Sequence, residues 1–309
     1  MKADVNRSSG AAEHTREAVW SAAPERLDRV LSELGLARSR SRAAELIAAG
    51  GVTVDGSGAA KASLSVPRGA RVEVSGDDHY VGRAAHKLIA ALEQFDVEPA
   101  GRIALDLGAS TGGFTQVLLE RGVTAVQAID VGHDQLAAQL RGDARVHLVE
   151  GRNARDLTPE NLAADTGLDE RPSLVVADLS FISLSLVLPA ISECAAPEAE
   201  LLLLIKPQFE VGRVRDGVVT SPEQWAEAIR IVLDAAARYG FAARGIAESP
   251  IEGGAGNREY LAHFERAAAP VPTEWESRIA ALTGAAATVE PDAGAVETAG
   301  TQSTADGGR

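Results

Sequence analysis

The strongest constraint on the fold is a regular alternation of short apolar runs with helical stretches, beginning near residue 88. Five of these runs are four to seven residues long, at positions 103–107, 125–131, 146–149, 174–179 and 201–205. Strands that are apolar along their whole length are buried on both faces, which is typical of a parallel sheet covered by helices on each side. A long helix is expected over residues 221–239, with final edge strands over 241–248 and 259–264. The pattern predicts an α/β domain with a doubly wound, mostly parallel sheet.

A smaller unit precedes this domain, over residues 24–76. Apolar residues recur there at helical spacing between positions 26 and 34, and Ser39 is placed to cap a second helix, which glycines 50–51 terminate. Short strands are expected over residues 52–54 and 70–74. The unit is therefore predicted to be a small α+β domain.

The remaining segments have the composition of connectors and tails. Alanine, serine, glycine and charged residues dominate both ends of the chain, and such segments bury too little apolar surface to fold. The predicted order is a disordered leader at 1–23, the small domain at 24–76, a linker at 77–86, the large domain at 87–266 and a largely disordered acidic tail at 267–309.

Composition also limits the compartment and the partners. Cys194 is the only cysteine, so no disulfide can form within the chain, and a reducing cytoplasm fits best. Cys194 follows an apolar helical pattern, so we interpret it as a small core residue. No secretory signal is visible. The apolar stretch at 173–191 contains Asp178 and Pro189, so a buried strand followed by a helix explains it better than a membrane span. The formal net charge of −14 argues against a nucleic-acid partner, although an acidic protein can still present a basic patch.

A glycine-rich loop follows the first strand of the large domain. Residues 106–114 read DLGASTGGF and lead into a helix, and glycines there let the backbone turn sharply and approach a ligand closely. The spacing differs from the dinucleotide fingerprint G-x-G-x-x-G. Asp130 ends the next strand, where a carboxylate can accept hydrogen bonds from ribose hydroxyls or cap a helix. Together the loop and this acid favour a cofactor that carries a nucleoside.

Four charged residues stand in or beside apolar sequence, namely Lys87, Asp178, Lys206 and Glu259. Lys206 follows the run LLLLI and Asp178 lies near the end of the preceding strand, so both are expected at the ligand crevice. Burial disfavours the charged form of an amine, and a neutral amine can accept a proton from a hydroxyl. The alternative is that the four residues form ion pairs at the ends of the sheet. The six histidines show no spacing typical of metal ligands, so no metal site is predicted.

Four motifs occur in order along the chain. They are DLGASTGGFT at 106–115, DLSFIS at 178–183, KPQFE at 206–210 and GNREYL at 256–261. In these motifs, and over residues 25–266 as a whole, the chain resembles the TlyA-type, or hemolysin A-like, ribosomal RNA methyltransferases of the FtsJ-like superfamily. The resemblance implies a Rossmann-like methyltransferase fold, S-adenosylmethionine as the cofactor and an RNA ribose 2′-hydroxyl as the methyl acceptor.

The resemblance also implies roles for individual residues. Lys87, Asp178, Lys206 and Glu259 match a Lys-Asp-Lys-Glu catalytic tetrad, in which Lys206 stands next to the acceptor hydroxyl. The positions that match the cofactor site are Asp106, Gly108, Ser110, Thr111, Gly112, Gly113, Phe114, Asp130 and Asn153. Residues 82–85 read GRAA where the family commonly has S-R-G-G or S-R-G-A, so the turn before Lys87 is expected to differ.

The small domain resembles an S4-type RNA-binding domain, from RLD at 26–28 to GGVTVDG at 50–56. Arg38 and Arg42 are four residues apart and share one helix face, while Arg40 lies off it, and guanidinium groups suit phosphate. The candidate RNA contacts are Arg26, Arg38, Arg40, Arg42, Arg83, Arg213 and Arg215. If they do not bind RNA, Arg38, Arg40 and Arg42 lie on a solvated helix face and Arg83 lies in a solvated linker. Arg213 and Arg215 then belong to a plain surface loop.

The leading interpretation is a cytoplasmic rRNA (cytidine-2′-O)-methyltransferase that uses S-adenosylmethionine. Its substrate would be 16S or 23S rRNA, or both, in the 30S or 50S subunit, with no membrane partner and no obligate protein partner. Three alternatives are a hemolysin-like membrane-active protein, a ribosome-binding protein without catalysis and a small-molecule methyltransferase. A membrane-active protein is disfavoured because the chain lacks a basic amphipathic helix. A protein without catalysis is disfavoured because all four tetrad positions carry the expected residue types. A small-molecule enzyme would leave the S4-type domain unexplained.

Overall fold

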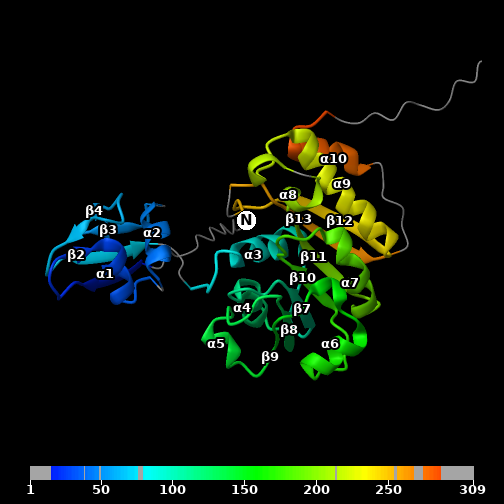
Figure 1. Ribbon diagram of the computed structural model, residues 1–309, viewed down its shortest axis with the longest axis horizontal. Helices are drawn as coiled ribbons and strands as arrows, with labels where there is room; N and C mark the ends of the chain where they lie inside the picture. The colour runs from blue at the N-terminus through cyan, green and yellow to red at the C-terminus, as the bar shows by residue number, and fades with distance from the viewer. Residues whose placement is uncertain are drawn as a thin grey trace, which may run out of the picture. The chain divides into compact units, whose positions relative to one another are not determined.

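The computed structural model describes residues 15–37, 39–48, 50–75, 79–212, 214–253, 256–267 and 274–286. The chain divides into two compact units, residues 1–82 and 83–309, and the division falls inside the linker predicted over 77–86. Figure 1 colours the small unit blue to cyan and the large unit cyan to orange.

The small unit combines two helices with a small antiparallel sheet. Helix α1 spans Leu27–Glu33 and α2 spans Arg40–Ala48. Ser39 caps α2 as predicted, since its Oγ accepts a hydrogen bond from the Arg42 amide at 3.1 Å. The sheet has the order β1-β6-β3-β4, and a separate pair joins β2 to β5. The bounds are Thr15–Val19 (β1), Glu25–Arg26 (β2), Val52–Val54 (β3), Ser57–Gly58 (β4), Ser65–Val66 (β5) and Arg71–Ser75 (β6).

Strand β1 corrects the prediction that residues 1–23 form a disordered leader. It pairs along its whole length with β6 in antiparallel register, beginning with Thr15 opposite Ser75. Trp20 then enters the core of the small unit, and its indole Nε1 donates to the Ala23 carbonyl at 2.8 Å. Composition could not show this pairing, because the partner strand lies at the far end of the unit. The part of the leader before β1 lies outside the described residues.

The large unit is built on a seven-stranded sheet with the order β12-β13-β11-β10-β7-β8-β9. Strand β13 alone runs opposite to the other six strands, so the predicted doubly wound, mostly parallel sheet is confirmed. The five apolar runs of the sequence form β7 to β11. The bounds are Ile103–Leu107 (β7), Ala125–Ile129 (β8), Val146–Val149 (β9), Leu174–Ala177 (β10), Glu200–Ile205 (β11), Phe241–Glu248 (β12) and Tyr260–Arg266 (β13).

The prediction of an edge strand over residues 259–264 is wrong, because β13 lies inside the sheet. Tyr260 stands opposite Ile205 of β11 on one side and opposite Glu248 of β12 on the other. The first five residues of β13 are buried, as expected for a strand with neighbours and helices on both sides. Of the two strands expected at the edge, only β12 lies there, and β9 forms the opposite edge. Because β13 is antiparallel, it begins at the side of the sheet where the parallel strands end.

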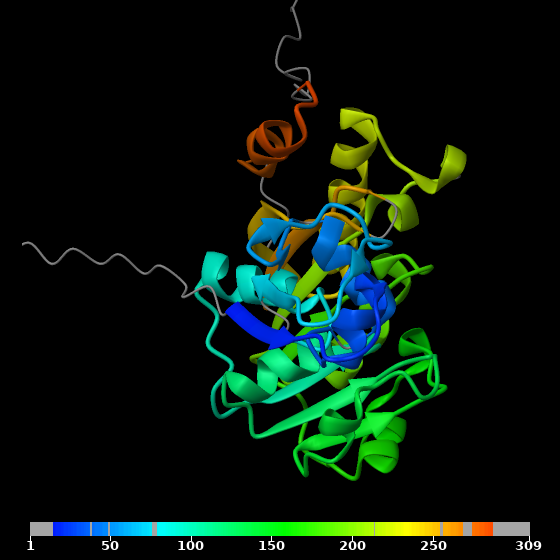
Figure 2. The same cartoon turned by 90° about the vertical axis from the view of Figure 1, so that its left-hand side faces the viewer.

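Helices cover both faces of this sheet, as Figure 1 and Figure 2 show. Helices α3 and α4 pack together on one face, whereas α6, α7 and α9 cover the other, where Leu105, Leu107 and Leu203 point into a common core. The bounds are Ala85–Phe95 (α3), Gly113–Glu120 (α4), Ala138–Arg141 (α5), Pro159–Thr166 (α6), Leu188–Cys194 (α7), Pro207–Glu210 (α8) and Pro222–Arg238 (α9), with 3-10 turns at Ala154–Asp156, Leu184–Leu186 and Arg215–Gly217. Cys194 is buried in this core, as predicted, and burial raises the pKa of its thiol to about 11.

Helix α10, over Glu274–Thr283, corrects the prediction of a largely disordered tail from residue 267. It packs on α9, where Ile279 is fully buried. The Arg230 guanidinium of α9 donates two hydrogen bonds to the Glu276 carboxylate, at 2.8 and 2.7 Å. The apolar residues of α10 lie among charged ones, so the surface they pack against is visible only in the fold. The end of the tail lies outside the described residues.

No helix within the described ranges is both long and apolar enough to cross a membrane. The stretch at 173–191, which has membrane length in the sequence, contains the strand β10, a 3-10 turn and the start of α7. The prediction of a buried strand followed by a helix is therefore confirmed for that segment.

Candidate active site

The ligand crevice of the large unit is expected where the strand order reverses, between β7 and β10. Gly108 follows β7 with a φ of +85°, a conformation that an L side chain rarely adopts. A Cβ atom added there would lie 2.9 Å from the Asp178 carbonyl oxygen, so the loop after β7 touches the end of β10. Gly112 has a φ of +99° and caps α4, and a Cβ there would overlap the Leu140 side chain. At both positions the positive φ and the neighbouring atoms of the protein leave no room for a side chain, so glycine is required.

Asp130 connects this loop to the end of β8. Its Oδ2 accepts a hydrogen bond from the Ser110 amide at 2.7 Å, and its Oδ1 accepts one from the Gly132 amide at 2.7 Å. Helix α5 begins only at Ala138, so Asp130 does not cap a helix. Each carboxylate oxygen can accept a further hydrogen bond, which leaves capacity for a ribose hydroxyl. The other loop positions are Ser110 and Thr111, which are exposed, and Gly113 and Phe114, which are buried.

Asp106 is fully buried in β7, just before the loop. Its Oδ2 accepts a hydrogen bond from the Thr115 hydroxyl at 2.6 Å, whereas its Oδ1 has no partner among the described residues. Burial raises the pKa of Asp106 to about 7, and the charges of Asp178 and Asp130 act in the same direction. A buried oxygen without a partner is uncommon in proteins, and a bound cofactor with a donor group would satisfy it.

Asn153 comes to the same edge of the sheet. The preceding Arg152 amide donates to the Asp130 carbonyl at 3.1 Å, and the Asn153 side chain caps a 3-10 turn by accepting from the Arg155 amide at 3.2 Å. Val131 is 68% exposed beside Asp130, and sequence reasoning missed it because a lone valine carries no signal. An exposed apolar side chain next to a ribose acceptor offers a contact for a planar base.

The four charged residues singled out in the sequence form one connected group. The Lys87 amine donates to Glu259 Oε2 at 2.6 Å and lies 3.4 Å from Asp178 Oδ2. The Lys206 amine lies 2.6 Å from Asp178 Oδ1 and donates to the Ser180 hydroxyl at 2.9 Å. Lys87, Lys206 and Glu259 are only 5%, 7% and 2% exposed. Two positive and two negative charges balance, so the group is buried without an unpaired charge.

Four separate segments bring these charges together. Asp178 and Lys206 directly follow the parallel strands β10 and β11, and Lys87 lies in the first turn of α3. Glu259 directly precedes β13, which begins where β10 and β11 end. The sequence predicted the places of Asp178 and Lys206 from their strands. The place of Glu259 depends on the antiparallel insertion of β13, which no local pattern reveals.

Two aromatic side chains stand beside this group. Phe181 has a φ of +65° and is 92% exposed, and its ring centroid lies 5.3 Å from that of Phe209. A bulky residue in the left-handed region is strained, and such strain persists where the surroundings hold it. Glu210 holds this loop, since its carboxylate accepts from the Ser183 hydroxyl at 2.5 Å and from the Leu184 amide at 2.8 Å. Sequence reasoning missed these roles, although both phenylalanines belong to the quoted motifs.

In the small unit, two predicted RNA contacts share a buried acid. Arg26 Nε donates to Asp28 Oδ1 at 3.0 Å, and Arg40 Nη2 donates to Asp28 Oδ2 at 2.8 Å. The hydrogen bond from Arg26 lowers the pKa of Asp28 to about 2, so the carboxylate is charged at neutral pH. Each guanidinium has further N–H groups, and both arginine side chains are at least half exposed. Both can therefore still donate to a phosphate.

The other predicted RNA contacts differ in what the structure shows of them. Arg42 pairs with Glu45 at 3.1 Å, and its side chain is only 18% exposed. Arg83 is exposed just before α3. Arg38, Arg213 and the side chain of Arg215 lie outside the described residues.

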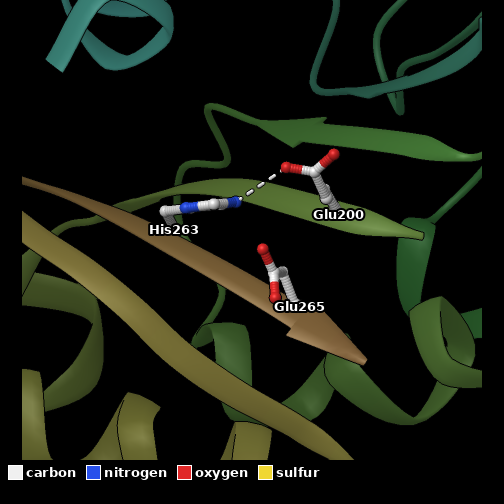
Figure 3. A group of neighbouring side chains, drawn as sticks. All are labelled: Glu200, His263 and Glu265. Atoms are coloured by element: carbon white, nitrogen blue, oxygen red, sulfur yellow. Dashed lines mark hydrogen bonds and ion pairs between the residues drawn. The ribbon is translucent and has the colours of Figure 1, made fainter. Parts of the chain in front are cut away.

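One group of side chains has the composition of a metal site, although the histidine spacing did not predict one. Figure 3 shows Glu200, His263 and Glu265 side by side. Their donor atoms lie within 4.8 Å of one another. They meet because Glu200 of β11 stands opposite Glu265 of β13. Each carboxylate already pairs with an arginine, Glu200 with Arg102 at 2.7 Å and Glu265 with Arg244 at 2.8 Å. We interpret the group as an ion-pair network, because the arginines already balance its negative charge.

Comparison with known proteins agrees with this architecture. The model of the FtsJ-like methyltransferase family matches residues 80–266, and that of the S4 domain matches residues 25–72. The chain is 48% identical over 241 residues to the 16S/23S rRNA (cytidine-2′-O)-methyltransferase TlyA of Mycobacterium tuberculosis, covering 76% of this chain and 88% of that protein. It is 38% identical over 247 residues to Hemolysin A of Brachyspira hyodysenteriae, covering 77% and 99%. A solved structure from Streptococcus thermophilus, whose name calls it a hemolysin, matches with a TM-score of 0.67 at 35% identity, covering 85% and 95%.

Proposed function

This chain belongs to the FtsJ-like methyltransferase family, and from that membership we propose that it methylates ribosomal RNA on a ribose 2′-hydroxyl. The methyl donor is S-adenosylmethionine, and the accepting nucleotide is a cytidine of 16S or 23S rRNA within a ribosomal subunit. The named relative from Mycobacterium tuberculosis supports the choice of cytidine. The S4 domain supports an RNA substrate despite the acidic chain.

One observation carries the proposal, namely that the tetrad adjoins the cofactor loop. The Asp178 backbone is in contact with Gly108, and the Asp178 carboxylate lies 2.6 Å from the Lys206 amine. A cofactor held by the loop would therefore present its reactive group close to Lys206. Ion pairs that only stabilised the sheet would have no reason to stand at this crevice.

The residues around Lys206 are arranged to handle a proton from the acceptor hydroxyl. The Lys206 amine is buried and lies 2.6 Å from the Asp178 carboxylate, which holds it at the crevice. A neutral amine would take the hydroxyl proton as the oxygen forms its bond to carbon, and a charged amine would stabilise the developing negative charge on that oxygen. Lys87 and Glu259 hold Asp178 in place from the other side.

The residues of the loop fit S-adenosylmethionine. When bound, the cofactor supplies a methyl group already activated by its sulfonium, so the protein mainly has to align the acceptor oxygen with it. Asp130 would accept hydrogen bonds from ribose hydroxyls, Val131 would contact the base, and the unpartnered Asp106 oxygen would accept from a donor on the cofactor. The exposed Phe181 stands where the base of the acceptor nucleotide could stack.

Asp130→Ala is expected to weaken the binding of S-adenosylhomocysteine by roughly 10–100-fold, the usual worth of a hydrogen bond to a charged group. The variant removes the ribose acceptor and also releases the Ser110 amide. Titration calorimetry measures the effect. Asp134→Asn is the matched control, because it removes an exposed charge from the same loop at a left-handed position that asparagine tolerates. Equal affinities of both variants, or binding of a nicotinamide dinucleotide instead, would contradict the assignment.

Deleting residues 1–75 is expected to abolish methylation of ribosomal subunits while leaving the affinity for S-adenosylhomocysteine unchanged. The reason is that the arginines of the small unit supply RNA contacts, whereas the large unit has its own core and the whole crevice. The affinity of the intact protein for subunits should fall as salt rises, because phosphate contacts release counterions. Full activity of the truncated protein on subunits would show that the small unit is dispensable.

The test of the function itself is incorporation of a tritiated methyl group. Isolated 30S and 50S subunits lacking the modification are incubated with the protein and labelled S-adenosylmethionine, and the labelled nucleotide is then mapped. We expect label on the ribose of a cytidine. Binding to subunits without any label would favour a non-catalytic ribosome-binding protein.

A further inference from the structure

A β-bulge shapes the outer edge of the large sheet, away from the tetrad. The register of β12 against β13 shifts between Ala243 and Gly245, so no residue of β13 stands opposite Arg244 in the backbone register. A bulge redirects the side chain at that position and is common at sheet edges. A Cβ atom on Gly245 would lie 2.5 Å from the ring of Phe95, so the glycine lets this ring lie directly against β12. The edge is thereby hollowed at the end of α3.

The hollow is a groove walled by three elements. Phe95 comes from the end of α3, Arg244 from the bulge, and Trp275 and Arg278 from α10. The groove encloses about 420 Å³. Sites of about 300–1,000 Å³ hold small molecules, so this volume is enough for one nucleotide.

The groove is positively charged although the chain has a formal net charge of −14. Arg244 pairs with Glu265 at 2.8 Å. The Arg278 guanidinium donates to the Ile246 carbonyl at 3.3 and 3.2 Å, and no carboxylate of the described residues lies within salt-bridge distance of it. One of the two positive charges is therefore uncompensated. Guanidinium groups bind phosphate with paired hydrogen bonds, and aromatic rings stack on bases.

The groove is within reach of an RNA strand that occupies the active site. Helix α3 carries Lys87 in its first turn and ends with Phe95, eight residues later. At 1.5 Å per residue the two positions are about 12 Å apart along the helix axis. The tetrad and the groove thus lie at opposite ends of one rigid helix.

We propose that this groove binds a single-stranded segment of the substrate RNA next to the methylated nucleotide. A phosphate of that segment sits between Arg244 and Arg278, and a base lies against Trp275. The inference rests on the proposed function for the identity of the ligand. The groove would act as a second RNA contact besides the small unit, and it would set which neighbouring nucleotides the enzyme accepts.

The test measures binding of a fluorescent single-stranded oligoribonucleotide of mixed sequence to the full chain, without any methyl donor. Arg278→Gln should weaken binding roughly tenfold, as expected for a lost charge-assisted contact. It should also reduce the slope of log affinity against log salt by about 0.7, the value for one phosphate on a single strand. The control is Arg238→Gln, which removes one charge from the end of α9, outside the groove. A 4-thiouridine in the oligoribonucleotide should cross-link to α10 or to the end of α3.

Three results would overturn the proposal. They are equal affinity and salt slope of the two variants, absence of oligoribonucleotide binding by the intact protein at low salt, and displacement by a poly-glutamate peptide of equal charge. The last would mean that the groove takes an acidic peptide. No step of this binding experiment uses methyl transfer. Its result can therefore be interpreted even if the labelling assay on subunits fails. Thermal unfolding of Arg278→Gln checks that α10 stays folded.

Discussion

Lys206→Ala is expected to lower the rate of methyl transfer by roughly 10²–10⁴-fold, the usual contribution of a positioned acid or base. Lys206 is 7% exposed, and its amine lies 2.6 Å from the Asp178 carboxylate and donates to the Ser180 hydroxyl. In the proposed function this amine stands beside the acceptor hydroxyl. The rate should be measured in single turnovers with saturating subunits. The affinity for S-adenosylhomocysteine should stay within about twofold of the original, because the cofactor residues are untouched. Near-normal turnover of Lys206→Ala would remove this residue from the mechanism.

Lys206→Arg separates the two roles that the geometry allows. A guanidinium stays protonated and cannot accept a proton, but it still supplies positive charge to the acceptor oxygen. If proton acceptance matters, Arg and Ala should lose similar activity, and the original enzyme should speed up with rising pH as one group loses its proton. If only charge matters, Lys206→Arg should retain much more activity than Lys206→Ala. The rate of the original enzyme should then not rise with pH in this way. The larger guanidinium can also misfit, so the pH profile decides between the two roles.

The difference between local and long-range information explains which parts of the site the sequence could predict. Asp178 and Lys206 follow apolar strands, and parallel strands all end at the ligand side of a sheet, so a local pattern places them. For Lys87 and Glu259 the sequence showed only a charge in or beside apolar residues, and their place at the crevice came from the resemblance, because a helix start and an antiparallel strand carry no such rule. The backbone of Phe181 has a positive φ, which depends on the packing of its loop and not on its side chain.

The same distinction holds for the fold. The five parallel strands β7 to β11 were predicted because each is largely apolar, whereas β1 and α10 were missed because each mixes apolar with charged residues. Pairing of β1 with β6 and packing of α10 on α9 decide their structure. The cluster of Glu200, His263 and Glu265 was invisible for a similar reason, since its members are brought together only by the register of β11 and β13.

Glu259→Gln is expected to destabilise the large unit by about 3 kcal/mol, because it leaves the buried Lys87 charge without its nearest partner. The estimate is at the lower end of the range for broken buried pairs, since Asp178 remains 3.4 Å from Lys87. For a domain of this size the melting temperature should fall by roughly 6–12 °C. Differential scanning calorimetry measures the change. A melting temperature within about 1 °C of the original would show that the pair is not held as tightly as its 2.6 Å distance implies.

The double variant Lys87→Met with Glu259→Leu tests whether this pair serves stability or catalysis. Replacing both members of a buried ion pair by apolar residues is often neutral for stability, so its melting temperature should return close to the original. Asp178 would then have Lys206 as its only charged neighbour in the tetrad, and its second carboxylate oxygen would lose its contact with Lys87 on α3. We therefore expect the double variant to be stable, to bind S-adenosylhomocysteine normally and to methylate subunits at least tenfold more slowly, since the loss of one hydrogen bond to a charged group has that effect. A stable double variant with full activity would assign Lys87 and Glu259 to the stability of the sheet and leave only Asp178 and Lys206 for the chemistry.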